Sequence, residues 1–198
     1  MTAIAFSLSE TEAMIMVDTL VTWPQGQRPP IEGHKYYISP CGRLVIIPMG
    51  SLEAAIKWVE FVDSYLMNND ISSLMNNAQE KLSKIWSALP STGGIFQVFM
   101  FHYEGQNVCC TGFASYKGFE PVCFKAYGLD SFYPFPFAPQ RVSQNLNRER
   151  RGIEIIEEIK REDDLNDVQQ RAGIGGHIDL IRGSNGSFTV QDDYYSFA

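Results

Sequence analysis

The hydrophobic pattern of this 198-residue chain changes its period at Gly50. Before Gly50 the apolar residues stand in strand-length runs separated by polar residues, proline and glycine. After it they recur at the i, i+3, i+4 spacing of an amphipathic helix. Ser51 is placed to cap the first of two such helices. The sequence therefore predicts strands at 2–8, 13–18, 34–39 and 44–49, a loop at 23–33, and helices at 51–67 and 71–86.

The second half of the chain returns to strand-like patterns and contains one further helix. Three prolines at 132–139 remove backbone donors, so this aromatic segment is predicted to be a loop rather than a central strand. The predicted elements are strands at 96–103, 108–113, 121–127, 177–182 and 187–191, a helix at 148–164, and a tail at 192–198 that frays or docks. The grouping predicts an α+β layered fold rather than alternating βαβ units, in one domain spanning residues 1–198.

Charge and composition exclude several classes of function. The chain has 16 basic and 23 acidic residues, and its formal net charge of −7 argues against binding nucleic acid or anionic membranes by bulk electrostatics. Membrane-spanning and export patterns are absent from the sequence, which predicts a cytoplasmic protein with reduced cysteines. The three histidines share no metal-ligand spacing with one another or with the cysteines. The sequence therefore predicts no metal and no cofactor.

Several short motifs resemble, in order, those of proteasome β subunits and bacterial proteasome-like peptidases, members of the N-terminal-nucleophile (Ntn) hydrolase superfamily. In these proteins a terminal Thr starts the first strand, an Asp closes the second, a Lys opens the third and a Gly precedes the first helix. The similar segments here are Thr2-Ala-Ile-Ala-Phe6, Met16-Val-Asp-Thr19, His34-Lys-Tyr-Tyr-Ile-Ser-Pro40, Pro48-Met-Gly-Ser51 and the later Gly173-Ile-Gly-Gly176. The resemblance implies a four-layer αββα sandwich of two antiparallel sheets.

The resemblance also implies a site that hydrolyses a peptide or amide. Thr2 stands where the family has its nucleophile. Once Met1 is removed, the α-amine of Thr2, with a free pKa of about 8, can accept the proton of its own hydroxyl. Asp18 matches the Asp that tunes the nucleophile, and the backbone N–H of Gly50 matches the donor that stabilises the oxyanion.

The lysine of the family has two candidates in this chain. Aligned without a gap from the following proline, it falls on His34, whose charge would be weaker and switchable. Lys35 lies one position away, which on a strand is the opposite face, so only a local bulge would bring it inward. The family's later Asp and Ser fall on Arg171 and Ile174, and its Gly-Ser-Gly falls on 127–129. Supporting polar groups are therefore expected to be missing.

Each site residue also has an ordinary structural interpretation. Asp18 at a strand end is typical of a turn, His34 of a hydrogen-bonding side chain, Lys35 of a solvated charge, and Gly50 of a tight turn before a helix cap. Two functions stay open. The departures favour a catalytically silent homo-oligomeric assembly or binding subunit, and the alternative is a threonine peptidase or amidohydrolase that is active once Met1 is removed. In either case the resemblance implies self-association into a ring or a stacked homo-oligomer.

Overall fold

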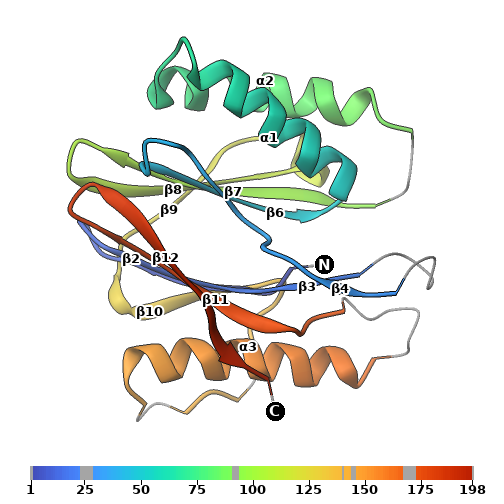
Figure 1. Cartoon of the computed structure of the whole chain (residues 1–198), viewed down its shortest axis with the longest axis vertical. Coiled ribbons are helices and arrows are strands. Elements are labelled where there is room, and N and C mark those ends of the chain that lie inside the picture. The colour runs from blue at the N-terminus through green and yellow to red at the C-terminus, as the bar shows by residue number, and fades with distance from the viewer. Residues whose placement is uncertain are drawn as a thin grey trace. The chain divides into compact units, whose positions relative to one another are not determined.

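The computed structural model describes residues 2–22, 29–90, 94–139, 141–143, 146–166 and 173–197. The chain divides into two compact units. The terminal unit comprises Met1–Lys35 and Ala126–Ala198, and the central unit comprises Tyr36–Lys125. Each unit has its own antiparallel sheet and its own helices (Figure 1). The predicted single domain over residues 1–198 stays a prediction.

The terminal unit is built on a five-stranded antiparallel sheet in the order β10-β1-β2-β11-β12. Its strands are β1 (Ile4–Leu8), β2 (Ala13–Asp18), β10 (Gly128–Phe135), β11 (His177–Ser184) and β12 (Ser187–Ser196). Every residue of β1 and β2 is buried, which explains their continuous apolar runs. A separate two-stranded ribbon joins β3 (Leu20–Val21) to β4 (Ile31–Glu32).

One helix, α3 (Arg148–Asp164), packs against the sheet of the terminal unit (Figure 1). The Asn147 side chain caps it by accepting a hydrogen bond from the backbone N–H of Arg150 at 2.9 Å. Its isoleucines form one stripe that joins a core cluster with Met14 and Met16 of β2. The predicted helix at 148–164 is confirmed, although its composition is strongly charged, because one narrow apolar stripe is enough to attach it.

The central unit is built on a second five-stranded antiparallel sheet, in the order β5-β6-β7-β8-β9. Its strands are β5 (Tyr37–Ile38), β6 (Leu44–Gly50), β7 (Phe96–Glu104), β8 (Asn107–Ala114) and β9 (Val122–Phe124), and a short 3₁₀ helix, η2 (Ser115–Lys117), follows β8. The helices α1 (Leu52–Leu66) and α2 (Ile71–Ser87) cover one face of this sheet (Figure 1). The fully buried Trp58 lies in the core between them. Both predicted helices are confirmed.

The turn from β6 into α1 requires glycine. Gly50 has a φ of +94°, and a Cβ at this position would lie 1.9 Å from the backbone oxygen of Ile95. The next residue, Ser51, caps α1 by accepting a hydrogen bond from Ala54 N at 3.3 Å. A tight turn and a helix cap therefore account for Gly50 and Ser51 without a catalytic role.

Three expectations about strands need correction, and one pair of alternatives is decided. The segment at 132–139 is not all loop, because β10 extends to Phe135; it lies at the edge of its sheet, where Pro134 can miss a donor without breaking a ladder on both sides. The strand expected at 34–39 is reduced to β5. Of the two alternatives for the tail at 192–198, docking is observed in its described residues, since β12 continues to Ser196 and the aromatic side chains of Tyr194, Tyr195 and Phe197 pack against the core cluster. The loop expected at 23–33 contains β4, and its residues 23–28 lie outside the described part of the chain.

Among the residues that the structure describes, no helix is both long and apolar enough to cross a bilayer.

Candidate active site

A buried ion pair joins two of the predicted site residues in the terminal unit. Asp18 is the last residue of β2, and Lys35 lies between β4 and β5. The Lys35 Nζ donates to the Asp18 Oδ2 at 2.7 Å, with 7% and 0% of the two side chains exposed. A charged pair this deep is held in place because each partner compensates the charge of the other.

The Asp18 carboxylate also accepts hydrogen bonds from two backbone N–H groups. Ala3 N donates to Oδ1 at 2.7 Å, and Gly175 N donates to Oδ2 at 3.2 Å. A second hydrogen bond holds the backbone at Ala3, in which the backbone N–H of Asp18 donates to the Ala3 oxygen at 3.2 Å. Thr2, the next residue, is buried with only 4% of its surface exposed. Asp18 therefore holds the backbone directly beside Thr2, together with the glycine segment that starts at Gly173.

Burial changes the pKa of both members of the pair. Removal from water raises the pKa of Asp18, and the charge and hydrogen bond of Lys35 oppose that change. Removal from water lowers the pKa of Lys35, and the Asp18 carboxylate opposes it in turn. Each group therefore depends on the other to stay ionised. A lysine with a lowered pKa at this position is closer to proton exchange near neutral pH than a solvated lysine is.

The structure places Lys35, and not His34, on Asp18. The sequence argument assumed a strand through both residues, in which a shift of one position reverses the face. In the structure residues 33–36 belong to no strand, and the backbone N–H of Gly33 donates to the oxygen of Thr19 at 2.9 Å. Strand alternation therefore does not apply here, and no bulge is needed to turn Lys35 inward.

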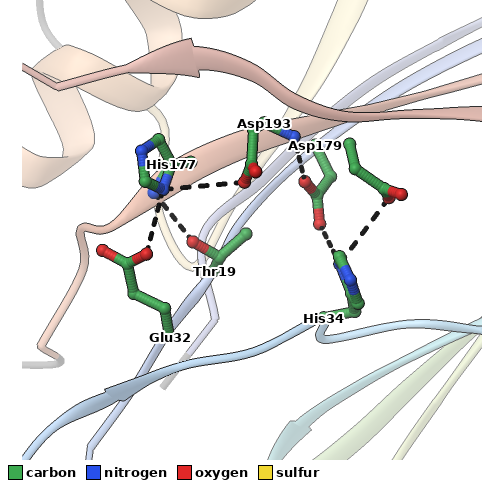
Figure 2. Close-up of polar contacts among 7 residues, drawn as sticks. Thr19, Glu32, His34, His177, Asp179 and Asp193 are labelled. Carbon is green, nitrogen blue, oxygen red and sulfur yellow. Dashed lines mark hydrogen bonds and ion pairs between the residues drawn. The ribbon is translucent and has the colours of Figure 1, made fainter.

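His34 points to a different carboxylate. Its Nδ1 lies 2.9 Å from the Asp179 Oδ2 and 3.7 Å from the Asp192 Oδ1. Figure 2 shows this contact beside a second one, in which the His177 Nδ1 lies 3.1 Å from the Glu32 Oε2 and 3.6 Å from the Asp193 Oδ1. The hydrogen bond to Asp179 raises the pKa of His34. His34 therefore belongs to a His–carboxylate cluster on β11 and β12 rather than to the Lys35–Asp18 pair.

The positions that correspond to the family's further Asp and Ser do not supply those polar groups in the described residues. Ile174, at the place of the family's Ser, is a buried apolar residue in the core of the terminal unit, and Arg171 lies outside the described residues. A different carboxylate reaches this segment, because the Asp163 Oδ2 accepts a hydrogen bond from Gly173 N at 2.9 Å. Asp130, which lies next to the segment 127–129, is exposed.

Gly50 belongs to the central unit. Its predicted role as the oxyanion donor for Thr2 stays a prediction.

Sequence reasoning did not identify Gly175 and Asp179 as contact residues. Gly175 was noted only as part of a glycine-rich strand start, and its N–H contact with Asp18 joins residues 157 positions apart. Asp179 had a usable signal, since it is a charged residue within the apolar run 178–181 of a strand. A buried acid in such a run indicates a specific polar partner.

Comparison with solved structures identifies the fold. A Gly−1 mutant of Anbu from Hyphomicrobium sp. strain MC1 superposes with a TM-score of 0.63 at 15% sequence identity, and the match covers 100% of this chain and 87% of the Anbu chain. The chain shares the fold of this Anbu structure. The likeness confirms the predicted α+β fold class with its two antiparallel sheets and its helices. No family model matches this chain, and no curated protein sequence matches it. With so little sequence identity, the likeness to Anbu establishes the fold and leaves the activity to be argued from the site.

Proposed function

We propose that this protein is an Ntn hydrolase that cleaves a peptide or amide bond, with Thr2 as its nucleophile after Met1 is removed. One observation carries the proposal, namely the buried Lys35–Asp18 pair beside the first residues of the chain. A surface charge pair would tolerate many substitutions, but a buried pair costs several kcal/mol of desolvation, of order 5 per ion, before its attraction is counted. Expensive charges of this kind are common at sites that tune a reacting group.

The chemistry follows from the residues that the structure holds together. With a free α-amine, Thr2 would lose its hydroxyl proton to that amine as its Oγ attacks the substrate carbonyl. The positive charge of Lys35 favours the anionic form of an oxygen and the neutral form of an amine in its vicinity. Asp18 contributes by positioning, because its Oδ1 fixes Ala3 and its Oδ2 fixes Lys35. The scissile C–N bond then breaks, the protonated α-amine gives its proton to the leaving amine, and the acyl group stays on the Thr2 Oγ as an ester. A water molecule, deprotonated by the same α-amine, would hydrolyse this ester to a carboxylic acid and restore the hydroxyl.

A second candidate function is a catalytically silent assembly or binding subunit with the same fold. The burial of apolar Ile174 at the place of the family's hydroxyl favours it. Self-association into a ring or stacked homo-oligomer is part of both proposals, since the resemblance to proteasome β subunits implies it.

The deciding experiment labels Thr2 covalently. Intact mass first establishes whether Met1 is removed, and light scattering establishes the assembly state of the same sample. A peptide epoxyketone, which needs both the hydroxyl and the free amine of a terminal threonine, is then added. We expect one adduct per chain, lost in Thr2→Ala and retained in Thr11→Ala, a matched control on the exposed turn between β1 and β2.

Two outcomes separate the candidates. A Met-free, assembled sample that takes up no label contradicts the hydrolase and leaves the silent subunit. Labelling that disappears in Thr2→Ala but persists unchanged in Lys35→Met contradicts the role given to the buried pair, because the reaction would then not depend on the lysine charge.

A further inference from the structure

We propose that His34, Asp179 and Asp192 bind one divalent transition-metal ion. The three ligand atoms come from three segments of the terminal unit: the connection after β4, the strand β11 and the strand β12. These atoms all lie within 4.8 Å of one another. The sequence predicted no metal because its histidines show no ligand spacing, and residues 145 positions apart in the chain cannot reveal such a site by spacing.

The distances are close to those of atoms that share an ion. Donor atoms bonded to a metal at about 2.0–2.2 Å lie roughly 3.0–3.5 Å from one another in octahedral or tetrahedral geometry. The His34 Nδ1 lies 2.9 Å from the Asp179 Oδ2 and 3.7 Å from the Asp192 Oδ1. The exposed side chains of His34 and Asp192 can adjust their positions to take up an ion.

The central ligand is already oriented by the fold. Asp179 is 0% exposed, and its Oδ1 accepts a hydrogen bond from the backbone N–H of Asp193 at 2.9 Å, which leaves Oδ2 directed at His34. A ligand carboxylate held by a backbone hydrogen bond in this way is typical of the groups that surround metal sites. The pairing of β11 with β12 is irregular between Ile178 and Leu180, so several residues of β12 face Asp179 there.

A second imidazole, that of His177, lies among the carboxylates of the same cluster. The His177 Nδ1 is buried and makes no hydrogen bond within the described ranges, although it faces the carboxylates of Glu32 and Asp193 at 3.1 and 3.6 Å (Figure 2). Four carboxylates thus surround two histidines in this cluster: Glu32, Asp179, Asp192 and Asp193. These carboxylates concentrate negative charge at one place, which attracts a divalent cation.

The donor types select the class of ion. One imidazole nitrogen with two carboxylate oxygens suits Zn²⁺, Mn²⁺ or Fe²⁺, whereas Mg²⁺ and Ca²⁺ prefer oxygen donors alone. The side chains of His34 and Asp192 are each 55% exposed, which provides a path from solvent and leaves coordination positions for water.

Such an ion would fasten the segment that carries Lys35. His34 precedes Lys35 directly, so an ion shared by His34, Asp179 and Asp192 would tie residues 33–35 to the β11–β12 hairpin. Thr2 is not among the proposed ligands. The metal proposal therefore does not depend on whether Thr2 reacts.

The test is a titration of the full-length protein, stripped with EDTA, with Zn²⁺ by calorimetry and with Co²⁺ by visible absorption. We expect one ion per chain, the absorption bands of an N/O-ligated Co²⁺, and a higher Tm with metal. His34→Gln and Asp192→Asn are both expected to weaken binding at least tenfold. Both sites are half exposed, so these variants should fold; Asp179, being buried, is left intact.

Two controls keep the result specific. Glu53→Gln removes a carboxylate of similar exposure on α1 and is expected to leave binding unchanged. Cys109→Ser tests a rival cluster of the central unit, formed with His102 and Glu104, and is also expected to leave it unchanged. Binding that is lost in Cys109→Ser, or that is unchanged in both His34→Gln and Asp192→Asn, overturns the proposal, as does the absence of stoichiometric binding.

Discussion

Two adjacent residues, His34 and Lys35, pair with two aspartates of neighbouring strands in different surroundings. Lys35 contacts Asp18 at the end of β2, and both side chains are almost completely buried. His34 contacts Asp179 of β11, and its own side chain is 55% exposed. The two strands are paired in antiparallel register, with Ile178 opposite Asp18. The two ion pairs therefore differ mainly in their access to water.

That difference should decide what each pair does. A buried pair is stabilising only as a unit, because losing one partner leaves an uncompensated charge in a medium of low polarity. A half-exposed pair is screened by water, contributes little to stability, and can exchange its partner for a proton or a metal ion. The buried Lys35–Asp18 pair therefore suits a fixed role beside Thr2. The half-exposed His34–Asp179 pair suits the reversible binding of a proton or a metal ion.

The largest expected effect is that of Lys35→Met. This variant leaves Asp18 buried without its cation, and we expect the free energy of unfolding to fall by about 3–5 kcal/mol at pH 7. Urea denaturation measures it. Lys57→Met, which breaks an exposed pair with Glu53 on α1, is the control and should cost less than about 1 kcal/mol. Equal losses in the two variants would show that the burial of the Lys35–Asp18 pair has no energetic consequence.

An intermediate loss of stability is expected for Gly176→Ala. Gly176 has a φ of +76°, and a Cβ there would lie 2.5 Å from the Thr19 Oγ1, which accepts a hydrogen bond from His177 N. We expect a loss of roughly 2–3 kcal/mol from backbone strain and steric overlap. Gly128→Ala is the matched control, because its φ is +89° with open space around the added carbon, and it should cost about 1 kcal/mol. Equal Tm values for the two variants would contradict the close contact.

The smallest effect is expected for His34→Gln, and it should depend on pH. The contact with Asp179 raises the pKa of His34, so the folded state binds the proton more tightly than the unfolded state. The resulting stability is fully present below about pH 6.5, the unfolded pKa, and is lost as the pH rises through the folded pKa. With EDTA present, we expect a difference from the unsubstituted protein of at most about 1 kcal/mol at pH 5.5 that shrinks by pH 8.5. A difference that grows with pH would contradict this account.

Most of the fold was accessible from the sequence because its elements have strong local signals. The period change at Gly50, the N-cap Ser51 and the isoleucine stripe of α3 all correspond to observed elements. Errors occurred where tertiary pairing overrode local preference. Pro134 lies in β10 because that strand is at a sheet edge.

The candidate site was accessible only in part. Thr2, Asp18 and Lys35 were selected by their order along the chain, but the sequence could not decide between His34 and Lys35. That decision depended on where strand pairing stops, and residues 33–36 pair with neither neighbouring strand in a regular ladder. The contacts of Asp18 with Gly175 and of His34 with Asp179 join distant residues, so local pattern carried no information about them.

The sequence by itself determined the order and type of most elements, since hydrophobic period, caps and turn residues act over a few positions. Only the tertiary structure decided which basic residue meets Asp18, and that the neighbouring histidine meets a second buried aspartate. The physical reason is that burial and charge compensation are properties of surroundings assembled from segments far apart in the chain. A single residue or its sequence neighbours do not contain that information.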